Sequence, residues 1–232
     1  MSTPAEDRSA LPYYADNPFN EHEKPAVQSD LRIAFIGNSL TLHDPMAEIG
    51  WSHRHGMAAS APGLDYAHAL LQRLRLAPAQ AYIRNFYPFE SDLSVAPGHL
   101  ATLQDLWRQH PPVTVIQLGD NVGNQEQLNA FAHNLQLLTA AAVQASPHVF
   151  LASTWWQSPP KDYVIERICQ LYGANYVFIG DLFNHPENSD RRHITYAHGG
   201  VEAHPKDWGM DQIAERLFRA IINRLLPGHP AA

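Results

Sequence analysis

Short, largely apolar runs recur along the chain and predict buried β-strands. The first covers residues 31–36 (LRIAFI) and is followed by Gly37. Similar runs occupy residues 81–86, 113–118, 148–152 and 176–179. Strands that are apolar along most of their length are typical of a parallel sheet, because such a sheet is covered on both faces.

Between these runs, apolar residues recur at the spacing of amphipathic helices. Predicted helices cover residues 64–74, 99–108, 125–145, 161–172 and 206–226. In the last of them, Ile213, Leu217, Ile221 and Leu225 share one face, and charged side chains occupy the other faces. Alternating strands and helices with right-handed crossovers predict an α/β fold, in which helices cover both faces of a doubly wound, five-stranded parallel sheet.

The length of 232 residues and the 45% hydrophobic content are sufficient for one substantial core. We expect an extended N-terminal arm over residues 1–29, which are rich in Pro, Asp, Glu, Asn and Ser. One domain over residues 30–228 and a short tail over 229–232 follow it.

The net charge of −7, with no long basic run, argues against a nucleic-acid partner. A single cysteine excludes an internal disulfide framework. No apolar stretch approaches the roughly 18 residues of a membrane span. The expected location is cytoplasmic if Met1 is native, and secreted or periplasmic if a signal peptide was removed.

We look for candidate catalytic residues just after the predicted strands, because the ligands of such sheets bind beyond the carboxyl ends of the strands. Ser39, in the sequence GNSLT, follows the first strand, and Asn121, in GDN, follows the third. His204 precedes Pro205, just before the last helix. An imidazole suits the removal of a proton from a serine hydroxyl at neutral pH, and an amide can donate to an oxyanion.

Together, GNSLT, GDN and the final HPxxxG resemble the SGNH (GDSL) hydrolase family in order and placement. The resemblance implies a flavodoxin-like sheet and an esterase that needs no cofactor. It also implies that Ser39 is the nucleophile and donates a backbone N–H to the oxyanion hole, that Asn121 donates its amide there, and that His204 is the base. The family's second block ends in a glycine that donates a backbone N–H, and Glu90 stands at that place.

The fifth block of the family, DxxH, has no acid here, because Val201 stands three residues before His204. Glu202 is the nearest carboxylate in the sequence and is a candidate to orient the imidazole. The alternative is a Ser–His dyad, in which a backbone carbonyl or a distant acid such as Glu90 holds the Nδ1 proton.

Aromatic residues and histidines in the loops are candidates for binding substrate. Trp51, Trp155 and Trp156 could form apolar walls for a sugar ring or an acyl chain. The expected substrate is a small acyl ester, with acetyl groups on carbohydrate preferred. A silent glycan-binding module is the alternative. A metal-assisted hydrolase is less favoured, because the spacing of its candidate ligands, His43, His53 and His55, is not that of a helical metal-binding pair.

Overall fold

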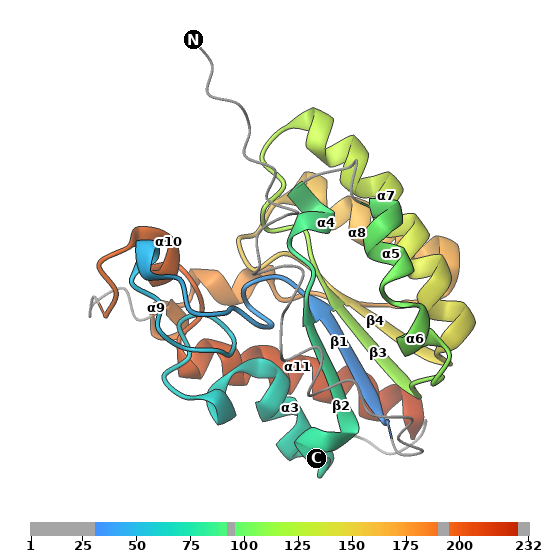
Figure 1. The fold of residues 1–232 in the computed structure, drawn as a ribbon, viewed down its shortest axis with the longest axis horizontal. Coiled ribbons are helices and arrows are strands. Elements are labelled where there is room, and N and C mark those ends of the chain that lie inside the picture. The colour runs from blue at the N-terminus through green and yellow to red at the C-terminus, as the bar shows by residue number, and fades with distance from the viewer. Residues whose placement is uncertain (1–30, 92–95, 190–194, 227–232) are drawn as a thin grey trace.

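The computed structural model describes residues 31–91, 96–189 and 195–226. Its five strands form one parallel sheet in the order β2-β1-β3-β4-β5 (Figure 1). The predicted five-stranded parallel sheet is therefore confirmed. The strands are β1 (Ile33–Gly37), β2 (Ala81–Asn85), β3 (Val113–Gln117), β4 (His148–Ala152) and β5 (Asn175–Val177).

Helices cover both faces of this sheet, as the alternating pattern predicts. The α-helices are α3 (Tyr66–Leu74), α4 (Pro88–Ser91), α5 (Ala96–Ala101), α6 (Gln104–Trp107), α7 (Gln125–Ala145), α8 (Pro159–Tyr172), α9 (Pro186–Ser189), α10 (Gly199–Glu202) and α11 (Asp207–Leu225). Short 3-10 helices occupy Ala47–Ile49, Pro62–Leu64, Pro78–Gln80 and Gly180–Asn184.

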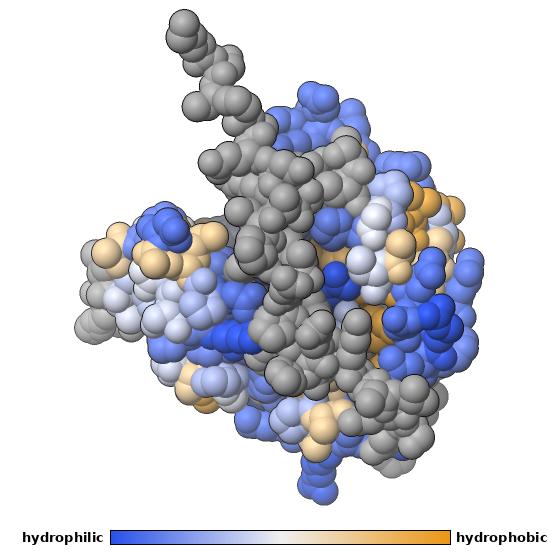
Figure 2. Space-filling view, in the orientation of Figure 1, coloured by the Kyte–Doolittle hydropathy of each residue, from blue (hydrophilic) through white to orange (hydrophobic). Residues whose placement is uncertain are grey.

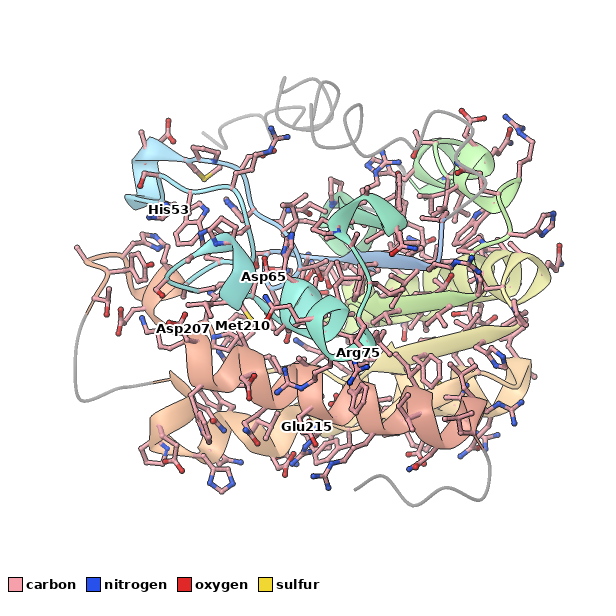
Figure 3. The ribbon with its side chains drawn as sticks, turned by 90° about the horizontal axis from the view of Figure 1, so that it is seen from below. His53, Asp65, Arg75, Asp207, Met210 and Glu215 are labelled. Carbon is pink, nitrogen blue, oxygen red and sulfur yellow. The ribbon has the colours of Figure 1, made fainter. Side chains whose placement is uncertain are left out.

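Alternate residues of β1 point to opposite sides of the sheet and so build two separate cores. Ile33 and Phe35 face the core formed with α3 and α11, whereas Ala34 and Ile36 face the core formed with α7 and α8. Helices α3 and α11 lie side by side, as Figure 3 shows. On the face drawn in Figure 2, most of the described surface is hydrophilic, as expected when the apolar side chains are used inside.

One predicted helix, over residues 99–108, is interrupted. The hydroxyl of Thr102 donates to the carbonyl of His99 at 2.6 Å, and α5 ends at Ala101. Such a local side-chain bond competes with helical pairing, so α6 starts only at Gln104. By contrast, α7 has the predicted bounds, and the side chain of Asn124 caps it by accepting from the N–H of Gln127.

The predicted fifth strand is shifted: residues 176–179 were expected, and β5 covers Asn175–Val177. The expected arm over residues 1–29 and the tail over 229–232 lie outside the described residues. Among the described residues, no helix combines the length and the apolar character that a membrane span requires.

Candidate active site

The turn after β1 places Ser39 at the carboxyl edge of the sheet. Gly37 ends the strand, and a Cβ atom there would lie 1.9 Å from the hydroxyl of Thr41 and 2.9 Å from the carbonyl oxygen of Gln117. Only glycine fits this position. Asn38 then organises the turn, since its carbonyl accepts from the N–H of Thr41 at 3.0 Å and its side-chain oxygen accepts from that of Leu40 at 3.1 Å.

Ser39 and His204, which are 165 residues apart in the sequence, meet at this edge. The hydroxyl of Ser39 lies 2.7 Å from Nε2 of His204. On the other side of the ring, Nδ1 lies 2.6 Å from the carbonyl oxygen of Gly200. A carbonyl only accepts hydrogen bonds, so Nδ1 carries the proton and Nε2 presents its lone pair to the serine hydroxyl. This is the tautomer that a general base requires.

The imidazole is held in its neutral form. Burial lowers the pKa of His204 from 6.5 to about 4, and this effect outweighs the Gly200 carbonyl, which raises it. His43 and Lys206 lower the pKa further through their charges. His204 is 6% exposed. At neutral pH the ring is therefore free to accept a proton.

A correction concerns Glu202, the candidate orienter. Its carboxylate accepts from Lys206 Nζ at 2.8 Å and from the N–H groups of Thr195 and Tyr196. It makes no hydrogen bond to the imidazole. The physical reason is local geometry: Gly199–Glu202 is a helical turn, which brings the backbone carbonyl of Gly200 to the ring four residues later. Glycine has no side chain, so the sequence carried no signal for this partner.

Asn121, in the loop after β3, lines the same cavity as Ser39 and His204. Its Nδ2 donates one hydrogen bond, of 2.6 Å, to Glu90. The backbone N–H of Ser39 makes no hydrogen bond within the described part of the chain. Within the described residues, one N–H of the amide and the backbone N–H of Ser39 therefore have no hydrogen-bond partner.

A second correction concerns the backbone of Glu90, expected to donate to the oxyanion. Its N–H instead donates to the carbonyl of Tyr87 at 3.1 Å, because residues 88–91 form the short helix α4. The side chain is 3% exposed and accepts from Asn121 Nδ2 and from the N–H of Gly119. Burial raises the pKa of Glu90 to about 7, and the charge of Asp120 acts in the same direction.

Asp120, for which sequence reasoning assigned no role, joins the loops around the site. Its carboxylate accepts from Asn38 Nδ2 at 3.1 Å, from Gln117 Nε2 at 2.6 Å and from the N–H of Trp155 at 2.8 Å. The sequence did carry one signal for this role, because Asp120 stands between Gly119 and Asn121 at the end of a predicted strand. This one side chain therefore connects the loops after β1, β3 and β4 through hydrogen bonds.

The cavity beside Ser39 has a volume of about 310 Å³. Its walls combine apolar and polar side chains, and the described residues that line it are Ser39, His43, Met46, Ile49, Met57, Asn85, Tyr87, Asn121, His198, Gly200, Val201 and His204. The apolar part comes mainly from Met46, Ile49 and Met57, which lie in the long loop after β1.

The three candidate tryptophans have different surroundings. Trp51 and Trp155 are 1% and 0% exposed, and each packs into an apolar cluster. They are structural side chains, which corrects their expected role as substrate walls. Trp156 is partly exposed, and its ring stands edge-on to His204 with the centroids 5.1 Å apart. Of the three, Trp156 is the one whose ring contacts the imidazole of His204.

The loop histidines do not converge on a common point suited to an ion. His53 and His55 stack on each other, with their ring centroids 5.3 Å apart, and His43 bonds through Nδ1 to the carbonyl of Asp44. Across the described ranges, no three His, Cys, Asp or Glu side chains are arranged to hold a metal ion.

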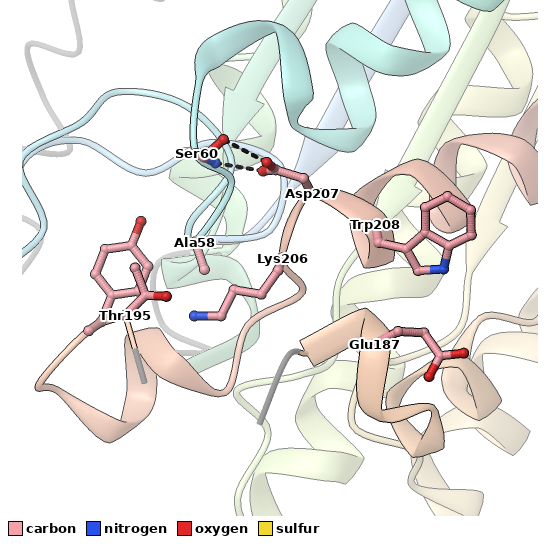
Figure 4. A pocket seen from close by; sticks show the side chains of 8 residues that line it. Ala58, Ser60, Glu187, Thr195, Lys206, Asp207 and Trp208 are labelled. Atoms are coloured by element: carbon pink, nitrogen blue, oxygen red, sulfur yellow. Dashed lines mark hydrogen bonds between the residues drawn. The ribbon is translucent and has the colours of Figure 1, made fainter. Parts of the chain in front are cut away.

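A second cavity, of about 380 Å³, lies beside the start of α11 (Figure 4). There Asp207 accepts hydrogen bonds from both the N–H and the hydroxyl of Ser60, at 2.7 and 2.6 Å. Lys206 also lines it and is paired with Glu202. Neither Ser39 nor His204 reaches this cavity, so it is separate from the serine site.

Comparisons with known proteins place this fold. No protein-family model and no curated protein matches the chain. Among solved structures, a GDSL-like lipase from Bacteroides uniformis has a TM-score of 0.55 at 12% identity, with 82% of this chain and 95% of that chain covered. TesA has a TM-score of 0.54 at 15% identity, with 84% and 99% covered.

A third solved structure is a two-domain esterase, CEX, which is active on acetylated mannans and was crystallised with mannopentaose. It has a TM-score of 0.52 at 16% identity. The match covers 93% of this chain but only 56% of that esterase, so the chain spans little more than half its length. The sheet order, the placement of the loops and these likenesses agree: this chain has the fold of the SGNH (GDSL) hydrolases.

Proposed function

We propose that this protein is a serine esterase that hydrolyses small acyl esters. The observation that carries the proposal is the 2.7 Å contact between Ser39 Oγ and His204 Nε2 in a cavity that Asn121 also lines. A hydroxyl, a neutral imidazole with its lone pair toward that hydroxyl, and a nearby amide donor are the groups that acyl transfer requires.

In the first half of the reaction, His204 takes the proton of Ser39 as the serine oxygen attacks the ester carbonyl. The carbonyl oxygen becomes an oxyanion, which accepts from the backbone N–H of Ser39 and from the Asn121 amide. His204 then gives its proton to the leaving alcohol, and an acyl-serine remains. In the second half, water attacks the acyl group with His204 again as the base, and the acid is released.

The imidazolium formed during the reaction is stabilised by the Gly200 carbonyl at Nδ1. A carbonyl supplies a partial charge where a triad supplies a full negative charge, so this site is proposed to work as a Ser–His dyad. The expected consequence is a base that stays neutral at acidic pH, in keeping with the lowered pKa of His204.

For the substrate, we favour acetyl esters of carbohydrates. A cavity of about 310 Å³ with Met46, Ile49 and Met57 on its walls suits a small acyl group better than a long chain. The partly exposed ring of Trp156 beside His204 offers a stacking surface for a sugar. The activity of the similar two-domain esterase on acetylated mannans supports the same choice.

The two alternatives have less support. A silent binding module would not need the serine hydroxyl and the imidazole in hydrogen-bonding contact, nor the imidazole in the tautomer of a base. A metal-assisted hydrolase would need ligands that converge, and His43, His53 and His55 do not converge.

The test replaces the nucleophile. Ser39→Ala should lower turnover of p-nitrophenyl acetate, and acetate release from acetylated mannan, at least about 10³-fold, because the covalent step is lost. Ser60→Ala, at an exposed serine that lines the second cavity and not the cavity of Ser39, is the matched control and should keep wild-type rates. Equal rates for wild type and Ser39→Ala would refute the proposal.

A further inference from the structure

A buried carboxylate holds the loop that carries the candidate oxyanion donor. Glu90 lies in α4, just beyond the end of β2, and is 3% exposed. One of its oxygens accepts from Asn121 Nδ2 at 2.6 Å, and the other accepts from the backbone N–H of Gly119. Gly119 has φ of +119°, a conformation that glycine adopts at little steric cost, and the hydrogen bond to Glu90 fixes its N–H in this turn.

We propose that Glu90 is a positioning residue for the oxyanion hole, in which its ionised carboxylate holds the Asn121 amide with an N–H directed at the reacting carbonyl. The proposal rests on the serine-esterase function proposed above. It replaces the backbone donation expected of position 90 with a role for the side chain.

The hydrogen-bond donors and acceptors around Glu90 determine the orientation of the Asn121 amide. An ionised carboxylate only accepts hydrogen bonds, and here its two oxygens accept from the N–H of Gly119 and from Asn121, with the side-chain amide of Asn38 as a further donor nearby. The nitrogen of the Asn121 amide must therefore face Glu90, because the amide oxygen would be repelled. An amide nitrogen carries two hydrogens, so fixing one on Glu90 leaves the second to point into the cavity that Asn121 lines. The carboxylate thus ensures that the cavity receives a donor.

Protonation of Glu90 would break this match. One oxygen would become an O–H donor facing an N–H donor, so either the Gly119 turn or the Asn121 amide would have to rotate. Glutamine at position 90 presents the same conflict at every pH. The variant Glu90→Gln is therefore a permanent mimic of the protonated wild-type protein.

Burial raises the pKa of Glu90 to about 7, so this protonation takes place near neutral pH. Among the described residues, Asp120 is the charged group that acts on it. Other titratable groups lie on the neighbouring elements. His99 of α5 packs against the ring of Phe86, and Glu126 and His133 of α7 are exposed to solvent.

The first experiment measures kcat, KM and their pH dependence for p-nitrophenyl acetate. Wild-type kcat should fall as pH drops through about 7. Glu90→Gln should reduce kcat up to about 10²-fold at pH 8, with KM changed less than about threefold, because the lost interaction acts on the transition state. The kcat of the variant should not show this fall near pH 7, which we call the limb of the pH profile. The kcat values of the two proteins should therefore approach each other at acidic pH. Glu126→Gln is the matched control and should follow wild type.

A double-mutant cycle then separates positioning from general support. If Glu90 acts through Asn121, Glu90→Gln in an Asn121→Ala background should cost less than about threefold. Asn121→Ala alone should also lose the limb near pH 7. That measurement decides the matter even if Glu90→Gln does not fold, which circular dichroism would show.

Two results would overturn the proposal. One is a loss of activity for Glu90→Gln that is equally large with and without Asn121, and the other is a limb near pH 7 that survives in Asn121→Ala. Either could occur while Ser39→Ala is inactive, in which case the esterase function stands and only the role of Glu90 fails. If wild type hydrolyses no ester, the function fails and the role of Glu90 fails with it.

Discussion

At the scale of single residues, His204 shows how backbone can replace an acidic side chain. The Gly200 carbonyl fixes the tautomer, and burial keeps the ring neutral. Burial lowers the pKa of the imidazole, and the Gly200 carbonyl, which brings no full charge, raises it too little to offset this effect, whereas a carboxylate partner would raise it more.

This lowered pKa predicts a pH-dependent contribution to stability. The pKa of His204 is about 4 when folded and about 6.5 when unfolded, so between these values the unfolded chain binds more protons. Its contribution is fully present above pH 6.5 and is lost as pH falls toward 4. The unfolding free energy of wild type, relative to His204→Asn, should therefore decrease by up to about 3 kcal/mol from pH 7 to pH 4.

The measurement is urea denaturation of both proteins at several pH values. Glu90 has a raised pKa and works in the opposite direction, but it is present in both proteins and cancels in the difference. A difference that does not change with pH would contradict a neutral, buried His204.

At the scale of elements, α11 shows the close relation between sequence pattern and packing. Ile213, Leu217 and Ile221 of the predicted face are all 0% exposed and lie in the core with α3. The fourth residue predicted on that face, Leu225, is the last residue of the helix and is 40% exposed. On the outer side, Arg73 of α3 pairs with Asp211 and Glu215 of α11. These pairs are partly exposed, so the apolar face supplies most of the stabilisation.

Truncation along this helix should therefore have graded effects. Leu217→Ala removes a fully buried side chain and should lower the unfolding free energy by about 3 kcal/mol, since it leaves a cavity. Leu225→Ala, at a side chain that is 40% exposed on the same helix, should cost less than about 1 kcal/mol. Thermal or urea denaturation of both variants measures the contrast, and similar losses would show that α11 is not packed as described.

At the scale of the whole molecule, the site exists because the sheet gathers distant loops at one edge. Asp120 accepts from Asn38 after β1 and from the backbone of Trp155 after β4, and it stands next to Asn121 after β3. One carboxylate therefore couples the positions of the proposed nucleophile and of the oxyanion donor to the sheet.

Asp120→Asn should disturb this coupling. An amide puts a donor where the carboxylate accepted, opposite Asn38 and Gln117 or opposite the N–H of Trp155. The unfolding free energy should fall by about 2–3 kcal/mol and kcat should fall as well. Asp105→Asn, at an exposed ion pair on α6, is the control and should change stability by less than about 1 kcal/mol. Unchanged stability in Asp120→Asn would show that Asp120 is protonated in the folded protein.

The sequence by itself determined the strand–helix alternation, the parallel sheet, and the loops that carry Ser39, Asn121 and His204. These follow from local periodicity and from the rule that the ends of parallel strands share one edge. Only the tertiary structure decided that the Gly200 carbonyl contacts His204, that the side chain of Glu90 accepts from Asn121, and that Trp51 and Trp155 are buried. Those outcomes depend on how backbone groups and distant side chains meet in space, and a local pattern carries no information about such meetings.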